Sequence, residues 1–254
     1  MALDEAILEH IGRGQALPTL RLYAWDPPCL SLGHAQPLAD VDFARLQAHG
    51  WEVVRRLTGG RAILHTDELT YSVIAPAHEP HVAGSVLESY NRLAAALLEA
   101  VRLLGLPVEM KDGAQGENSG PPNPVCFEVP SAYEITALGK KLIGSAQARK
   151  REGVLQHGSL PLSGDLSRIT QALAFPDEGA RLDAAARLLE RAATVECVLG
   201  RPVDWDTAAA AFVRAFEAKL GLDLREGELS QSERARAEEL VREKYDHAVW
   251  MERV

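Results

Sequence analysis

The hydrophobic pattern of the chain changes between helical and strand periods, which predicts a mixed fold. The first stretch, "MALDEAILEHIG", has the apolar spacing of an amphipathic helix. "TLRLYAW" then alternates, and "CLSLGHAQ" follows after the turn signal "DPP", so the two segments predict a pair of strands. "DVDFARLQAHG" predicts a short helix with Asp40 as its N-cap and Gly50 as its end.

Two later segments share a pattern of three strands joined by turns. The first is "WEVVRRLTGGRAILHTDELTYSVIAP", and the second is "SAYEITALGKKLIGSAQARKREGVLQHGSLPL", with turns near Gly139 and Gly153. Because the connections are short, we expect antiparallel pairing within each three-strand meander. A long helix from Ser85 to Gly105 separates them and begins with a capping box of Ser85 and Glu88. Its predicted apolar face consists of Val86, Tyr90, Leu93, Leu97, Val101 and Leu104.

After about Ser163 the chain is helical and rich in alanine, as in "LDAAARLLERAATVECVLG", "DWDTAAAAFVRAFEAKLG" and "SQSERARAEELVREKYDHAVWMERV". "KDGAQGENSGPPNP" predicts a polar loop before the second meander. The 254 residues are enough for one large domain or one domain with a smaller appendage. The pattern therefore predicts an α+β fold.

Composition narrows the classes of function. With 46% hydrophobic and 25% charged residues the chain resembles an ordinary soluble globular protein, and no apolar run is long enough to span a membrane. A formal charge of -9 argues against nucleic-acid binding. The three cysteines are widely spaced without metal-ligand spacing, and no export signal is visible, so we expect a cytoplasmic setting and no metal.

The Gly-Gly turn in "RRLTGGRAILH" is the first candidate for ligand binding. Its glycines allow close backbone approach, and Arg55, Arg56 and Arg61 are available to hold an anion or a carbonyl oxygen. The turn matches neither phosphate-binding motif, G-x-x-x-x-G-K-[ST] or G-x-G-x-x-G. Taken alone, a Gly-Gly turn is more often a plain hairpin that carries solvated arginines, so the signal is weak.

The segment "GKKLIGSAQARK" is the second candidate. Lys140 and Lys141 are adjacent on a strand, so we expect one to face solvent and the other the working side of the sheet. The small residues Gly144, Ser145 and Ala146 suit close approach to a ligand, or to the long helix packed above them. His157 in "LQHGSL" is more often a packed or surface residue than a catalyst.

Cys126 is the third candidate because it ends a loop between Pro124 and Pro130. A nearby lysine favours the thiolate, which is the form that a cysteine nucleophile needs. Cys29, in an alternating strand, and Cys197, on a helix, have the pattern of inert packing residues. Spacing alone does not establish that Cys126 and Lys141 meet.

At these residues the chain resembles a known family. "RRLTGGRAILHTDELTYSV" resembles the signature of the lipoate–protein ligase and octanoyltransferase superfamily. "CFEVPSAYEITALGKKLIGSAQARKREGVLQHGSL" is similar to the cysteine-dependent octanoyltransferases that start protein lipoylation. The resemblance runs nearly end to end, and it leaves open whether an N-terminal strand is missing.

The resemblance implies the biotin/lipoate ligase catalytic fold: a mixed, largely antiparallel sheet flanked by helices, with a small C-terminal helical part. We expect the catalytic domain at residues 1–225 and the helical segment at 226–254. It implies transfer of octanoate from octanoyl-acyl carrier protein, through a cysteine thioester, to a lysine of a lipoyl domain such as the glycine-cleavage H protein. No cofactor is implied. Arg149, Lys150 and Arg151 are basic residues suited to guide acidic carrier proteins.

The resemblance also assigns residues. Cys126 corresponds to the acyl-thioester nucleophile, and Lys141 to the lysine that lowers its pKa. The implied positions around the acyl pocket are Arg55, Gly59, Gly60, His65, Tyr71, Gly144, Ser145, Ala146, Gln147, His157 and Gly158.

Three alternatives stay open at this point. One is an ATP-dependent lipoate or biotin ligase, which needs no nucleophilic cysteine. Another is an amidotransferase that moves octanoyl groups between lipoyl domains through a cysteine. The third is a non-catalytic acyl-carrier-binding protein on the same scaffold. "NPVCFEVPSAYEI" argues against the first, and the presence of both Cys126 and Lys141 against the third.

Overall fold

The computed structural model describes residues 1–112 and 133–254. The helices are α1 (Ala2–Gly12), η1 (Leu38–Asp40), α2 (Phe43–Ala48), α3 (Val86–Leu103), η3 (Leu166–Gln171), α4 (Glu178–Arg191), α5 (Val195–Leu199), α6 (Trp205–Leu220), α7 (Gln231–Leu240), η4 (Val241–Tyr245) and α8 (Ala248–Met251). The strands are β1 (Thr19–Tyr23), β2 (Cys29–Leu32), β3 (Glu52–Arg55), β4 (Ile63–His65), β5 (Glu68–Ala75), β6 (Val108–Asp112), β7 (Tyr133–Ala137), β8 (Lys140–Arg149) and β9 (Val154–Pro161).

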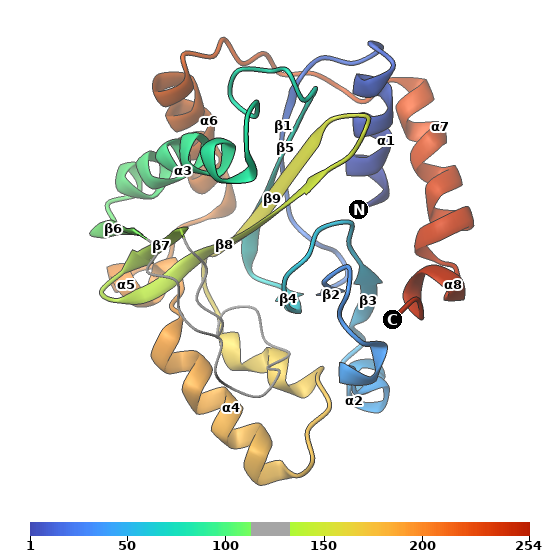
Figure 1. The fold of residues 1–254 in the computed structure, drawn as a ribbon. Coiled ribbons are helices and arrows are strands. Elements are labelled where there is room, and N and C mark those ends of the chain that lie inside the picture. The colour runs from blue at the N-terminus through green and yellow to red at the C-terminus, as the bar shows by residue number, and fades with distance from the viewer. Residues whose placement is uncertain (113–132) are drawn as a thin grey trace.

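The described strands form two sheets (Figure 1). The larger has the order β1-β5-β9-β8-β7-β6, and every neighbouring pair in it is antiparallel. The smaller has the order β3-β2-β4, with β3 parallel and β4 antiparallel to β2. The fold is therefore the mixed, largely antiparallel arrangement flanked by helices that the resemblance implies.

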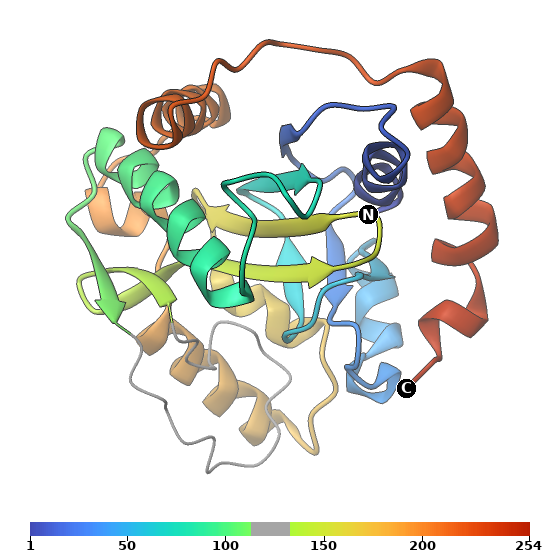
Figure 2. The ribbon, with the colours of Figure 1, turned by 45° about the horizontal axis from the view of Figure 1, so that its top comes forward.

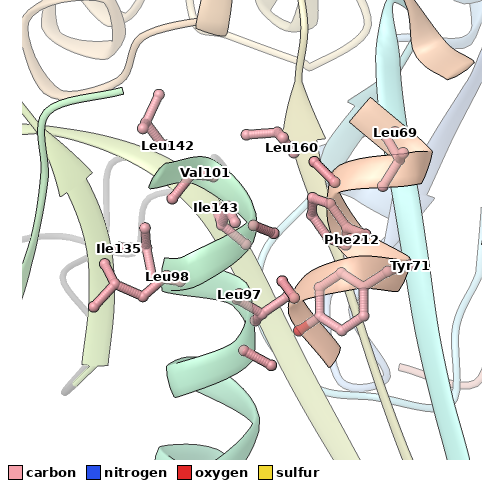
Figure 3. Packing of buried hydrophobic residues seen from close by; sticks show 14 of the residues in the cluster. Leu69, Tyr71, Leu97, Leu98, Val101, Ile135, Leu142, Ile143, Leu160 and Phe212 are labelled. Carbon is pink, nitrogen blue, oxygen red and sulfur yellow. The ribbon is translucent and has the colours of Figure 1, made fainter. Parts of the chain in front are cut away.

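Strand β5 is buried on both faces and thereby separates two packing layers. Leu69 and Tyr71 belong to the main core, which α3 and α6 complete with residues such as Leu97 and Phe212 (Figure 3). The alternate residue Ile74 belongs instead to the cluster that α1 forms on the other face. Because side chains alternate along a strand, the remaining residues of this second face are placed toward α1 and the smaller sheet.

The C-terminal helices pack on α1 (Figure 2). Ala6 of α1 contacts a cluster that includes Leu240 and Tyr245, and Arg236 of α7 forms an ion pair with Glu9. The division into a domain at 1–225 and a segment at 226–254 stays a prediction.

The long helix α3 begins where the pattern placed it. The capping box of Ser85 and Glu88 is present at the start of α3, and Leu93, Leu97, Val101 and Leu104 are buried. The assignment of Val86 to the buried face is wrong, because its side chain, in the first turn of the helix, is 52% exposed. The N-cap of α2 is Asp42 and not Asp40, since Asp42 accepts the hydrogen bond from the Arg45 amide. Asp40 instead accepts a bond from Gln36.

Strand pairing departs from the prediction in the first half. The segments Thr19–Tyr23 and Cys29–Leu32 do not pair with each other, because they lie in different sheets. Pro27 and Pro28 between them have no N–H groups to donate across a tight hairpin. The first meander is also wrong: residues 56–62 pass over the end of β2, so that β3 and β4 flank it. The second meander, β7-β8-β9, is antiparallel as predicted, and β6 extends it as a strand that the pattern did not indicate.

The packing of Phe212 gives a stability prediction. Its ring is fully buried between Tyr71 and Phe216, so Phe212→Ala removes apolar contacts and leaves a cavity. We expect the free energy of unfolding to fall by about 3–5 kcal/mol. The matched control is Phe43→Ala, because Phe43 is 49% exposed. Urea denaturation of the three proteins measures both changes, and equal losses would contradict this packing.

Candidate active site

A cavity lies between the two sheets, on the face of β5 opposite α3 and α6. It holds about 410 Å³ of empty space, including its opening to solvent. Its lining brings together the Gly-Gly turn, β2, β4 and the facing parts of β5, β8 and β9. The lining residues are Met1, Tyr23, Trp25, Ser31, Arg56, Gly60, Ile63, His65, Thr70, Gly144, Ser145, Ala146, His157, Gly158 and Ser159.

The cavity collects many of the residues that the sequence indicated from distant segments. Those that line it are Gly60, His65, Gly144, Ser145, Ala146, His157 and Gly158. Those that lie outside its lining are Arg55, Gly59, Tyr71, Lys141 and Gln147. Cys126 lies outside the described residues.

Gly158 is required by close packing. A β-carbon there would lie 2.4 Å from the Gly144 carbonyl oxygen and 2.8 Å from the Tyr71 ring. Tyr71 is fully buried, donates to or accepts from the Ser145 hydroxyl at 2.7 Å, and accepts a bond from Gln156. Tyr71 therefore supports the cavity wall from behind, through Ser145.

The shape of the Gly-Gly turn depends on Arg56. Its guanidinium donates to the carbonyl oxygens of Gly59 at 2.9 Å and Arg61 at 2.7 Å. It also donates to the Ser31 carbonyl at 2.8 Å and to the Thr58 hydroxyl at 3.2 Å. Arg56 thus fixes the turn to β2 while its side chain borders the cavity.

Arg55 does not line the cavity and forms its hydrogen bonds elsewhere. Its side chain is fully buried and donates to the carbonyl oxygens of Gly33 at 2.9 Å, Gln36 at 2.6 Å and Met251 at 2.6 Å. These bonds connect the loop after β2 with the end of α8. Neighbouring residues on a strand point to opposite faces, so only one of the two arginines reaches the cavity, and it is Arg56.

A buried polar group that the sequence did not single out lies around His65. Its Nδ1 is 2.5 Å from the carboxylate of Glu68, and its Nε2 is 2.7 Å from the hydroxyl of Ser31. The same carboxylate oxygen accepts bonds from Thr70 and Ser159. The indole of Trp25 stacks on His65 with a centroid distance of 4.2 Å and donates to Thr70. His65 ends β4 and Glu68 begins β5, three residues later, across a turn. This short spacing is the sequence signal that could have indicated their contact.

His157 is held neutral within the same face. Its Nε2 is 2.6 Å from the Thr58 hydroxyl. Burial lowers the pKa of His157 to about 3, although the nearby Asp4 carboxylate acts in the opposite direction. An imidazole with this pKa exchanges hydrogen bonds but carries no charge near neutral pH.

Strand β8 carries the two lysines on different faces. Lys141 is buried, and its backbone carbonyl accepts a bond from Ala193. Lys140 is half-buried and donates to the carbonyl of Leu189. Gln147, further along β8, contacts Ser89 of α3 and Gln156 of β9.

The other cysteines differ from each other. Cys29 is buried in β2, and burial raises the pKa of its thiol to about 12, in agreement with an inert packing role. Cys197 is exposed on α5, so the prediction that it is a core residue is wrong. The short helix α5 presents this position to solvent while Val195 enters the core.

Neither a metal-binding cluster nor a membrane-spanning helix occurs in residues 1–112 and 133–254. No group of three or more His, Cys, Asp or Glu side chains there is arranged to hold a metal ion. No helix in that part of the chain is long and apolar enough to cross a membrane.

Comparison with curated proteins finds relatives along the whole chain. The chain is 44% identical to octanoyltransferase LipM of Moorella thermoacetica, over 100% of this chain and 93% of that protein. It is 41% identical to octanoyltransferase LipM of Exiguobacterium sibiricum, over 98% of this chain and 92% of that protein.

Solved structures share the fold. The crystal structure of lipoate-protein ligase A bound with ATP matches with a TM-score of 0.79 and 27% identity, over 98% of this chain and 91% of that one. A bi-partite lipoate protein ligase from Thermoplasma acidophilum matches with a TM-score of 0.79 and 24% identity, over 99% of this chain and 92% of that one.

The model of the lipoyl protein ligase A/B catalytic domain matches residues 1–217. The chain therefore belongs to the lipoyl protein ligase A/B catalytic domain family, among its octanoyltransferases, which are acyltransferases of lipoate biosynthesis.

Proposed function

We propose that the protein takes an octanoyl group from octanoyl-acyl carrier protein onto Cys126 and passes it to a lysine of a lipoyl domain, such as the glycine-cleavage H protein. The observation that carries this proposal is the cavity between the sheets. Its lining follows β8 from Gly144 to Ala146, on the strand that also bears the buried Lys141. A cytoplasmic reaction, where thiols stay reduced, is part of the proposal.

The chemistry consists of two exchanges at one sulfur. The Cys126 thiolate attacks the donor thioester carbonyl, and the carrier thiolate leaves and takes up a proton. The neutral amine of the acceptor lysine then attacks the Cys126 thioester, releases the thiolate and loses one proton. The products are an amide and the free enzyme, so neither ATP nor a redox partner enters the balance. Both steps need a thiolate and donors for the developing oxyanion.

The cavity supports an aliphatic substrate. Burial of each CH₂ contributes about 0.8 kcal/mol, so two carbons fewer weaken binding by roughly tenfold. Glycine, alanine and isoleucine residues contribute to its lining. These residues leave room for a chain without presenting an unpaired charge along β8.

The covalent step gives the first prediction of function. Mixed with octanoyl-acyl carrier protein and no ATP, the protein should gain the mass of one octanoyl group, and Cys126→Ser should gain none. Cys29→Ser is the control, because a buried thiol with a pKa of about 12 does not supply a thiolate. Intact-mass spectrometry measures all three. A strict requirement for ATP with free octanoate would make the protein a ligase and overturn the proposal.

The second prediction concerns the cation beside the sulfur. We propose that Lys141 lowers the pKa of the Cys126 thiol below the free value of about 8.5. Lys141→Ala should raise that pKa by about one to three units and slow transfer most at neutral pH, with partial rescue as the pH rises. Lys140→Ala is the matched control, because Lys140 instead reaches the Leu189 carbonyl. The pH dependence of thiol alkylation measures the shift, and a shift in Lys140→Ala alone would refute this assignment.

The third prediction tests the neutral state of His157. Below its ordinary pKa of 6.5 this side chain takes up a proton in the unfolded chain, but in the folded protein it does so only near pH 3. The unfolded state then binds more protons, so folding stability falls as the pH drops from 6.5 toward 3. Between pH 6.5 and 5 this amounts to about 1.5 kcal/mol. Denaturation of His157→Gln should show a flatter pH dependence, whereas His78→Gln, at an exposed position, should keep the wild-type slope. Parallel profiles for wild type and His157→Gln would contradict a neutral buried imidazole.

A further inference from the structure

A group of cations surrounds His34, immediately beyond the Gly-Gly turn. We propose that this group, called here the His34 cluster and formed by Arg55, Lys150 and Arg253, binds the phosphate of the thioester donor. The inference rests on the proposed function, since it concerns the phosphopantetheine arm that carries the acyl group.

Contacts place Arg55 and Arg253 near His34. Arg55 donates to the His34 carbonyl at 3.3 Å. The His34 ring meets Trp250 edge-on at 5.5 Å, and the Arg253 guanidinium lies over the same indole, 4.7 Å from its centroid. Burial lowers the pKa of His34, and the charges of Arg253, Lys150, Arg55 and Lys244 lower it further.

The charge of the cluster is not balanced within the described chain. Lys244 is neutralised by Glu5, whose oxygens lie 2.6 and 2.8 Å from its ammonium nitrogen. Within residues 1–112 and 133–254, by contrast, no ion pair joins Arg55, Lys150 or Arg253 to a carboxylate. Like charges that gather without a counter-ion raise the local potential and favour a bound anion.

The burial of Arg55 makes the unbalanced positive charge of the cluster more unfavourable. Its side chain is fully buried and donates to backbone carbonyl oxygens, which carry no formal charge and so do not neutralise the guanidinium. Burial lowers the pKa of Arg55, and the charge of Arg253 lowers it further. A buried cation without a paired anion is unfavourable, so an anion beside Arg253 would stabilise both arginines.

The cluster is next to the cavity. Gly33 is pressed against the turn, since a β-carbon there would lie 1.9 Å from the Gly60 carbonyl oxygen. The His34 amide donates to the Thr58 carbonyl at 2.8 Å, and Thr58 contacts His157 of the cavity lining. The β8–β9 turn, which carries Lys150, and the C-terminal end, which carries Arg253, lie on the same side of the molecule (Figure 2).

This position favours the phosphate of the donor arm over carboxylates on a carrier surface. The phosphate is tied covalently to the thioester that enters the cavity, and it carries its charge on a compact group. Arginine binds such a group through two parallel N–H donors, and lysine adds a point charge. Glu152 is close to Lys150 in sequence, and Glu252 is next to Arg253. Neither glutamate forms an ion pair with these cations among the described residues.

Binding of two small molecules that differ only in the phosphate tests the proposal. Calorimetry should give a dissociation constant about tenfold lower for 4′-phosphopantetheine than for pantetheine, as expected for one charge-assisted contact. Arg253→Gln and Lys150→Gln should each remove most of that difference and leave pantetheine binding unchanged. Lys219→Gln is the control, because Lys219 is paired with Glu99 on the face of α3 and α6.

Acylation assays separate this inference from the proposed function. The S-octanoyl thioesters of both compounds should acylate the wild type, and the phosphorylated donor should have the higher kcat/KM by about the same tenfold factor. Equal binding of both compounds by the wild type would overturn the phosphate site, even if the carrier-bound donor reacts. Stronger binding of 4′-phosphopantetheine with no acylation from any donor would uphold the site and refute the transfer reaction.

Discussion

Two adjacent buried arginines hold the elements around the cavity in place. Arg55 is the last residue of β3, and Arg56 follows it. The Arg55 guanidinium reaches the loop after β2 and the end of α8, whereas the Arg56 guanidinium reaches Ser31 and the Gly-Gly turn. A guanidinium has five donors in a fixed fork, and here they meet backbone carbonyls of β2, the loop after it, the Gly-Gly turn and α8. The turn, the loop and the C-terminal helix are therefore held by two consecutive residues.

The elements of the fold were largely readable from the sequence because periodicity is a local property. Helix α3 with its capping box and the strands of the second meander follow from residues within one window. Partner choice is not local. β2 pairs with β3 and β4, and β1 with β5, because burial of the whole sheet decides the order. The exposure of Cys197 and Val86 has the same origin, since it depends on where a helix end lies relative to the core.

The candidate site was readable in its segments but not in its facing side chains. The sequence indicated the Gly-Gly turn and the small residues of β8, and the cavity is lined by parts of both. The resemblance named Arg55 for the acyl pocket, whereas Arg56 is the arginine that lines the cavity, because a one-residue choice of face is set by tertiary packing. Glu68, Ser31 and Trp25 were missed because their contacts with His65 cross from one strand to another. The roles of Cys126 and Lys141 still rest on the resemblance and on the proposed chemistry.

The polar groups around the cavity explain how it can accept an aliphatic chain. His65 is bound on both ring nitrogens, Glu68 accepts several bonds, and the indole of Trp25 donates to Thr70. Among the described buried side chains, the atoms without a hydrogen-bond partner are His34 Nδ1 and Trp205 Nε1, and neither residue lines the cavity. The described side chains of this wall therefore hold no buried polar atom that lacks a partner, which favours the burial of methylene groups against them. Arg55, Lys150 and Arg253 of the His34 cluster do not line the cavity, so a polar donor arm would be held apart from its acyl group.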